Sequence, residues 1–162
     1  RTINGEDMLF FIEALRNIYL QHGGLEEVFS QAWIQTGSMR SALIHFHHVF
    51  FSIPYPERSR RHIADVERDS AAKRLNLFLR WMVRPDHQNV DFGIWNRIPP
   101  SALMLPLDVH TGRVARNLGL LQRNQNDWKA VEEVTAVLRE FDPADPVKYD
   151  FALFGLGVFE GY

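Results

Sequence analysis

Glycine and proline divide this chain into short segments with helical hydrophobic spacing, and this pattern most constrains the fold. Within the segments, apolar residues recur every three or four positions, as they do on one face of an amphipathic helix. No segment alternates apolar and polar residues for more than a few positions, which is the pattern of a half-buried strand. We therefore expect an all-α fold, a compact bundle of about seven or eight helices.

Capping residues and chain breaks set the expected bounds of these helices. The first spans residues 6–21, and its inward face is expected to carry Leu9, Ile12, Leu15, Ile18 and Tyr19. Ser38 is expected to cap the third helix, and Asp69 or Ser70 the one that ends at Pro85. The other expected helices span residues 25–36, 39–51, 57–64, 106–118, 127–141 and 147–159, with short helical turns at 90–95 and 101–104.

Composition and length limit the class of protein. The 162 residues are 46% hydrophobic and 23% charged, as in soluble globular proteins. With no cysteine, disulfides, thiolate zinc sites and cysteine-ligated iron–sulfur clusters are excluded. No apolar run approaches the roughly 18 residues of a membrane span, so we expect a cytoplasmic protein with no membrane partner. Because the chain begins with Arg1 rather than Met, we expect residues 1–162 to be one domain, the larger C-terminal part of a longer protein.

The middle of the chain is basic and its ends are acidic. Residues 57–123 hold twelve Lys and Arg against seven Asp and Glu, whereas the remainder holds six against thirteen. This asymmetry favours a surface that faces a polyanion, although solvated faces of arginine-rich helices give the same pattern. The candidate phosphate-binding residues are Arg58, Arg60, Arg61, Arg74, Arg80, Arg84, His110, Arg113 and Arg116.

Lys73 and Asp108 stand at the starts of two expected helices in this basic region. A helix N-terminus and the neighbouring Arg74 both disfavour the charged form of the Lys73 amine, and a neutral amine is what a nucleophile requires. Asp108 follows the apolar run L-P-L, where its carboxylate can steer a proton or stabilise a developing cation. The alternative is that Asp108 only caps its own helix.

Three histidines on the third expected helix raise the question of a metal site. His45 and His48 are three positions apart and can share a helix face, whereas His47 points elsewhere. No Asp or Glu lies within six residues of them, and the helix is densely apolar. The pattern favours histidines at the edge of the core, so we expect no metal and no cofactor.

The residues around Lys73 and Asp108 resemble a known superfamily. The run P-L-D-V-H-T-G-R-V-A-R-N-L-G-L is similar to the segment that follows the hairpin in helix-hairpin-helix (HhH-GPD) DNA glycosylases, such as the archaeal 8-oxoguanine glycosylase. The run A-A-K-R-L-N-L-F-L is similar to the start of the second hairpin helix. The resemblance implies a Schiff-base role for Lys73 and a catalytic aspartate at Asp108, with His110 and Arg113 also matching.

Two features of this sequence depart from the glycosylase pattern. The glycine-rich hairpin that grips a DNA phosphate is replaced by A-D-V-E-R-D-S, where Glu67 and Asp69 repel a phosphate. Lys73 and Asp108 are 35 positions apart, a longer separation than in most members.

Four runs resemble a second, uncharacterised bacterial family of conserved hypothetical proteins much more closely. They are K-R-L-N-L-F-L-R-W-M-V-R, V-D-F-G-I-W, P-L-D-V-H-T-G-R-V-A-R and D-P-V-K-Y-D-F-A-L-F-G-L-G. This second resemblance covers nearly the whole chain, whereas the glycosylase resemblance is concentrated in residues 66–120.

The glycosylase resemblance implies a DNA repair glycosylase/lyase that excises an oxidised purine from duplex DNA through a lysine Schiff base. A base flipped out of the duplex stacks on aromatic side chains in such enzymes, and the candidates here are Trp81, Trp95, Phe151 and Phe154. Core packing is the alternative role of these aromatics. The alternative functions are a catalytically degenerate helical module that binds nucleic acid, and a helical protein-interaction domain.

Overall fold

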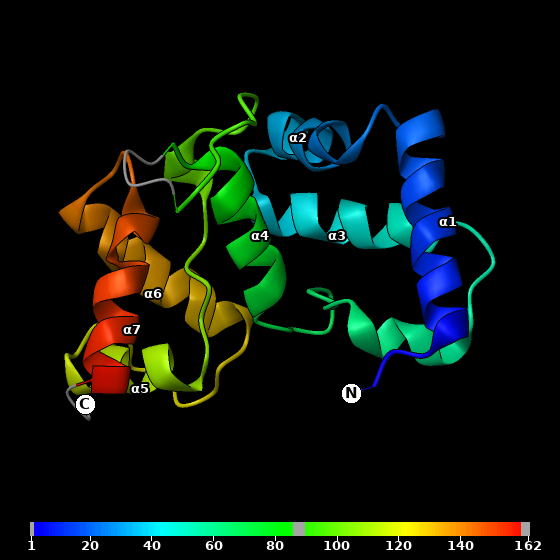
Figure 1. Cartoon of the computed structure of the whole chain (residues 1–162). Helices are drawn as coiled ribbons and strands as arrows, with labels where there is room; N and C mark the ends of the chain where they lie inside the picture. Colours follow the sequence, from blue (N-terminus) through cyan, green and yellow to red (C-terminus); the bar gives the residue numbers. More distant parts are fainter. Residues whose placement is uncertain (1, 86–89, 160–162) are drawn as a thin grey trace. The chain divides into compact units, whose positions relative to one another are not determined.

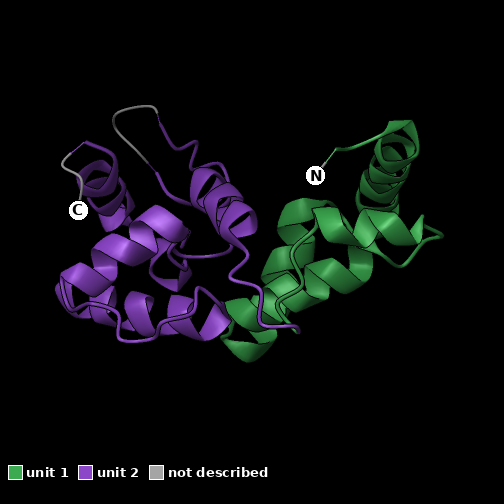
Figure 2. Ribbon diagram, turned by 90° about the horizontal axis from the view of Figure 1, so that it is seen from below, with its two compact units in different colours: residues 1–67 green, residues 68–162 purple. Residues whose placement is uncertain are grey.

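The computed structural model describes residues 2–85 and 90–159 of the chain (Figure 1). Within these ranges the fold is all-α, with seven α-helices and three 3₁₀ helices. The only strand-like pairing in the described residues is an isolated bridge between Ser70 and Asp127. The all-α expectation is therefore confirmed. The chain forms two compact units, residues 1–67 and residues 68–162 (Figure 2).

Unit 1 contains α1 (Gly5–Gln21), α2 (Leu25–Thr36), α3 (Met39–Phe50) and the 3₁₀ helix η1 (Glu57–His62). Helix α2 packs along α3, and α1 contacts both. Ser38 caps α3 as expected, because its side chain accepts a hydrogen bond from the Ser41 N–H. Gly37 ends α2 in the left-handed conformation, as a glycine after a helix commonly does. Stacked rings of Phe29 and Phe46, 4.5 Å apart, lie in the core of this unit.

The inward face of α1 differs from the expected one. Its buried apolar residues are Phe10, Ala14 and Ile18. Of the expected inward residues only Ile18 is buried; Leu9, Ile12, Leu15 and Tyr19 are exposed. The helix has apolar stripes on two faces, and periodicity alone does not show which stripe packs on α2 and α3.

Unit 2 contains α4 (Lys73–Val83), η2 (Pro100–Ala102), α5 (Val109–Asn117), α6 (Trp128–Phe141), η3 (Pro146–Tyr149) and α7 (Asp150–Phe159). Helix α6 opens at Asp127 as expected, with the Asp127 side chain accepting from the Ala130 N–H. Its inward face carries Trp128, Val131, Val134 and Leu138, all at most 1% exposed. Helix α5 packs closely on α7, which brings the N-terminus of one helix near the side of the other.

Three local expectations in unit 2 were wrong. The N-cap of α4 is Ala72, which has a left-handed backbone (φ 48°) and supplies no side-chain cap, rather than Asp69 or Ser70. Residues 90–95 form no helical turn, because their backbone N–H groups bond to α4 carbonyls, as from Trp95 N to Met82 O. The last helix begins at Asp150, after the separate turn η3, rather than at residue 147.

No helix in the described part of the chain is long and apolar enough to cross a membrane.

Candidate functional site

Lys73 and Asp108 meet through their side chains. Lys73 is the first residue of α4, and Asp108 is the N-cap of α5. The Lys73 Nζ donates a hydrogen bond to Asp108 Oδ2 over 2.6 Å, and the Thr111 N–H donates to Oδ1 over 2.8 Å. Asp108 therefore caps its own helix and pairs with Lys73 at the same time. The two interpretations that the sequence left as alternatives are compatible, because each uses a different carboxylate oxygen.

The environment of Asp108 keeps it ionised. Partial burial of the carboxyl raises its pKa, but hydrogen bonds from Lys73 and from the Thr111 backbone N–H lower it by more, so the pKa of Asp108 lies below its usual value. The Asp108 side chain is only 15% exposed, whereas that of Lys73 is 43% exposed. The carboxylate thus forms the sheltered side of the pair, and the amine is accessible from solvent.

A pocket of about 260 Å³ in unit 2 opens at this pair. Its lining comprises Lys73, Leu77, Arg80, Pro106, Asp108, Thr111, Asp150, Phe151 and Phe154. The structure thus places two of the four candidate base-stacking aromatics, Phe151 and Phe154, in the same pocket as the Lys–Asp pair. Trp81 and Trp95 lie outside this lining; Trp95 instead packs edge-on against Phe78.

Asp150 is a pocket residue that the sequence interpretation missed. It is the first residue of α7, it is 8% exposed, and its carboxylate pairs with the Arg80 guanidinium. Burial raises the pKa of Asp150 to about 6, more than the Arg80 charge lowers it. The signal in the sequence was an acidic residue directly before the apolar run F-A-L-F-G-L-G, which places a carboxyl at the margin of a core.

The raised pKa of Asp150 predicts a pH-dependent stability. Between pH 4 and pH 6 the folded state holds a proton on Asp150 that the unfolded state has released, so the free energy of unfolding falls as pH rises. A shift from 3.8 to about 6 corresponds to about 3 kcal/mol, at about 1.4 kcal/mol per pKa unit. Asp150→Asn removes this proton equilibrium. In urea unfolding from pH 4 to pH 7, we expect the free energy of unfolding of the wild type to fall relative to that of the variant by up to about 3 kcal/mol. Parallel curves for the two proteins would contradict the prediction.

Arg80 and Arg84 form ion pairs with carboxylates of their own unit. Arg80 Nε lies 3.2 Å from Asp91 Oδ1, and the same guanidinium binds Asp150. Arg84 bonds to Asp91 Oδ2 at 3.0 Å and to Asp145 Oδ2 at 2.8 Å. Only 4% of the Arg80 side chain and 17% of the Arg84 side chain are exposed. These ion pairs with Asp91, Asp145 and Asp150 disfavour a phosphate-binding role for both residues.

The three candidate arginines of unit 1 also make contacts within their own unit. Arg58 pairs with the buried carboxylate of Asp7 at 3.2 Å. Arg60 donates to the Tyr55 hydroxyl and lies over the Tyr55 ring. Arg61 donates to the Thr2 carbonyl at 3.4 Å. Arg58 and Arg61 remain exposed, and Arg60 is half-buried.

The other candidates lie in unit 2 with the pocket. Arg74 and His110 are exposed on the first turns of α4 and α5. Arg113 is exposed and donates to the Gly157 carbonyl of α7 at 3.3 Å. Arg116 is half-buried and bonds to the Arg123 carbonyl and to Asn126. Arg74, His110 and Arg113 are therefore the candidates with solvent-facing side chains near the two helix starts.

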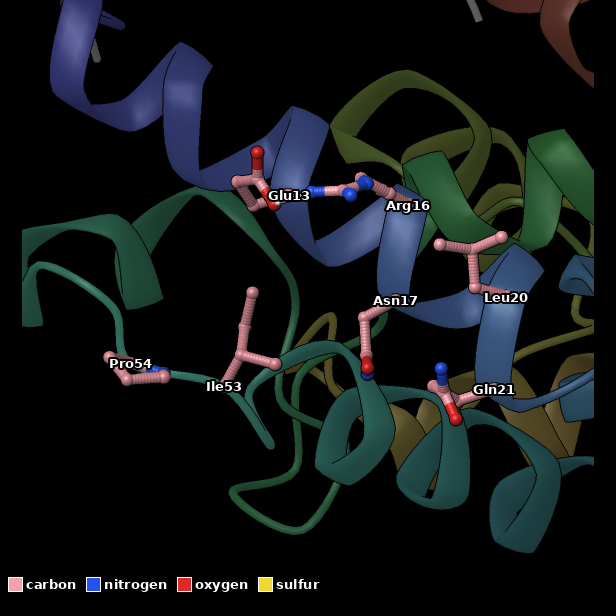
Figure 3. Close-up of a pocket in the computed structure, with 7 residues that line it drawn as sticks. All are labelled: Glu13, Arg16, Asn17, Leu20, Gln21, Ile53 and Pro54. Atoms are coloured by element: carbon pink, nitrogen blue, oxygen red, sulfur yellow. Dashed lines mark hydrogen bonds and ion pairs between the residues drawn. The ribbon is translucent and has the colours of Figure 1, made fainter.

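A second hollow, of about 460 Å³, lies in unit 1 beside α1 (Figure 3). It is bounded by the C-terminal half of α1 and by Ile53 and Pro54, which follow α3. Glu13 and Arg16 form an exposed ion pair at its edge. None of the predicted site residues lines this hollow.

The histidines of α3 form no metal cluster with other ligands in the part of the chain that the structure describes. His47 is buried, and this burial lowers its pKa, which favours the neutral ring. His48 Nε2 lies 2.9 Å from Glu67 Oε2, an acidic partner 19 positions away in the sequence.

Comparison with known proteins gives a family for the whole chain. A family model described as "Protein of unknown function (DUF2400)" matches residues 1–159. The chain belongs to the DUF2400 family. The four sequence runs that resemble an uncharacterised family lie within residues 1–159. The residues that line the Lys73–Asp108 pocket also lie within this range. No curated protein and no solved structure matches the chain.

Proposed function

We propose that this DUF2400 protein is a DNA repair glycosylase/lyase-like protein that excises an oxidised purine through a Schiff base on Lys73. The observation that carries the proposal is the 2.6 Å contact between Lys73 Nζ and Asp108 Oδ2 at a pocket lined by Phe151 and Phe154. This contact supports the roles that the resemblance to helix-hairpin-helix glycosylases implies for the two residues. If the Lys73 amine and the Asp108 carboxylate faced different parts of the molecule, they could not act together on one sugar.

The chemistry of the pair fits attack on a sugar C1′. In the proposed step, the Lys73 nitrogen forms a bond to C1′ as the bond from C1′ to the base breaks, and the electron pair of that bond leaves with the base. Asp108 is 2.6 Å from the amine, where its carboxylate accepts the amine proton or stabilises the cationic sugar in the transition state. Opening of the sugar ring then gives the imine that defines a lyase.

The pocket has the properties of a site for a single aromatic base. Its volume of about 260 Å³ lies just below the roughly 300–1,000 Å³ of pockets for larger ligands. Phe151 and Phe154 provide apolar surface for stacking, while Asp150 and Thr111 provide polar groups. A base taken out of the duplex requires both, since it is recognised by stacking and by hydrogen bonds to its edge.

A catalytically degenerate nucleic-acid-binding module is the alternative, and one observation favours it. Glu67 and Asp69 stand where the glycosylase hairpin binds a phosphate, and Arg80 and Arg84 bind internal carboxylates rather than solvent. Such a module would keep the fold and the exposed arginines but perform no excision.

Borohydride trapping distinguishes these functions. The protein is incubated with duplexes that contain an abasic site or 8-oxoguanine, together with borohydride, which reduces an imine to a stable covalent bond. We expect a protein–DNA adduct; no adduct with any such duplex would exclude the lyase mechanism. Titration of undamaged duplex at two salt concentrations tests the alternative, because binding through phosphates weakens as salt rises. Binding that is absent at low salt, or insensitive to salt, would remove both nucleic-acid functions.

A further inference from the structure

The loop before α6 is bonded to both helix starts that carry the Lys–Asp pair. This loop and the first residue of α6, residues 122–128, form the clamp loop. On the α4 side, the Trp128 N–H donates to the Asp69 carbonyl over 3.0 Å, and Asp127 forms the isolated bridge with Ser70. On the α5 side, the Asn126 Nδ2 donates to the Asp108 carbonyl over 3.1 Å. One short segment thus holds the chain before Lys73 and the backbone of Asp108.

The orientation of the Asn126 amide is fixed by Arg116. Arg116 Nη2 donates to Asn126 Oδ1 at 2.6 Å, and Arg116 Nε donates to the Arg123 carbonyl at 2.7 Å. A guanidinium can only donate, so the amide oxygen faces Arg116 and the amide NH₂ group is left for the Asp108 carbonyl. The donor-only guanidinium therefore determines which atom of the Asn126 amide is the oxygen and which is the nitrogen.

Gly112 leaves the space that this contact needs. A Cβ at position 112 would lie 2.7 Å from Asn126 Oδ1 and 3.0 Å from Arg116 Nη1. Gly112 is buried, and its N–H also donates to the Asp108 carbonyl at 2.9 Å. The carbonyl of Asp108 thus accepts one hydrogen bond from its own helix and one from the clamp loop, and a side chain at 112 would displace the second donor.

The other end of the clamp loop is anchored on α6. Arg123 Nε pairs with Asp127 Oδ1 at 2.7 Å, and the same carboxylate caps α6. The Arg123 pairing is the largest cause that lowers the pKa of Asp127, to about 2. This anchor stays ionised at any pH near neutrality and does not release the loop.

We propose that Asn126 is a positioning residue that, with Gly112 and Arg116, sets the place of Asp108 opposite Lys73. The clamp loop ties the segment before α4 and the N-cap of α5 to three consecutive residues, 126–128, so the two side chains meet at a fixed separation. The Thr111 bond to Asp108 caps α5 without Asn126, so loss of Asn126 shifts the pair rather than unfolding the helix. The catalytic role of the Lys73–Asp108 pair rests on the proposed function. The positioning of Asp108 by Asn126 rests on the hydrogen bonds alone.

Chemical labelling of Lys73 tests this positioning without any assay of base excision. The folded protein is treated over a range of pH with an acid anhydride that acylates amines, and labelling of Lys73 and of Lys129 is followed by mass spectrometry. The hydrogen bond between Lys73 Nζ and Asp108 must break before the nitrogen attacks the anhydride, so this bond slows labelling. We expect Asn126→Ala to raise the labelling rate of Lys73 about three- to tenfold, the range that the loss of one hydrogen bond between uncharged groups gives. The exposed Lys129 of α6 serves as internal reference and is expected to keep its rate.

Two further variants complete the design. Asn124→Ala removes an exposed asparagine from the same loop and is expected to leave Lys73 labelling unchanged. Asn126→Asp keeps the acceptor for Arg116 but loses the donor for Asp108, so it is expected to behave like Asn126→Ala and replaces it if that variant does not fold. Equal labelling of Lys73 in the Asn124 variant and in a folded Asn126 variant would overturn the proposal. The labelling result is independent of the adduct assay, so failure of the proposed function leaves it interpretable.

Discussion

Lys73→Gln is expected to abolish the borohydride-trapped adduct with abasic or oxidised DNA. Glutamine keeps most of the length and polarity of lysine but has no amine, so no imine can form with C1′. Lys73 Nζ is the pocket amine that contacts Asp108. We expect the adduct to fall below detection, while circular dichroism and the midpoint of thermal unfolding stay close to wild type because the Lys73 side chain is 43% exposed.

Lys129→Gln is the matched control for this experiment. Lys129 is an exposed lysine of α6 outside the pocket lining, and its replacement changes the net charge by the same amount. We expect it to form the adduct at the wild-type rate. If Lys73→Gln still forms the adduct, or if both variants lose it equally, Lys73 is not the Schiff-base residue.

Arg80→Met is expected to lower the free energy of unfolding by about 3–5 kcal/mol, the cost of breaking a buried ion pair by removing one partner. Arg80 binds Asp91, whose side chain is fully buried, and Asp150, whose side chain is 12% exposed. Without the guanidinium, Asp150 loses its ion pair with Arg80, and among the described residues Asp91 keeps its ion pair with Arg84. Urea unfolding at pH 7 measures the loss directly.

Arg113→Met is the control within the same unit. Arg113 is exposed and makes a single 3.3 Å hydrogen bond to the Gly157 carbonyl, so we expect a change of about 1 kcal/mol or less. The cost of Arg80→Met is also expected to shrink toward pH 4, because Asp150 then takes a proton and no longer needs a cation. An equal and pH-independent cost for the two variants would show that the buried carboxylates do not depend on Arg80.

Local chemistry made several elements predictable. Ser38 and Asp127 were expected to open α3 and α6, and both accept the capping hydrogen bond from a backbone N–H three residues later. Helices α2 and α5 were expected to end at residues 36 and 118, and the glycines that follow, Gly37 and Gly119, have positive φ. Capping and left-handed turns depend on one residue and its close neighbours in the chain, so a single sequence is enough to locate them.

Choices that depend on distant residues were not predictable in this way. Helix α1 has two apolar faces, and only its packing on α2 and α3 shows that Phe10 and Ile18, rather than Leu9 and Ile12, are inside. Arg80 and Arg84 looked like members of a basic surface because their partners, Asp91, Asp145 and Asp150, lie between 7 and 70 positions away. Net charge over a window of sequence does not reveal which charges are already neutralised.

The sequence by itself determined the all-α class, most of the helix bounds and Lys73 and Asp108 as candidate residues. It did so because helix periodicity, caps and breaks are local properties, and because the two residues lie in recognisable runs. Only the tertiary structure decided that the two side chains meet at 2.6 Å, that Phe151 and Phe154 share their pocket while Trp81 and Trp95 do not, and that Asp150 joins them. These facts depend on α4, α5 and α7 converging from segments 35 to 77 positions apart, a convergence set by packing of their buried faces and by the hydrogen bonds of residues 122–128.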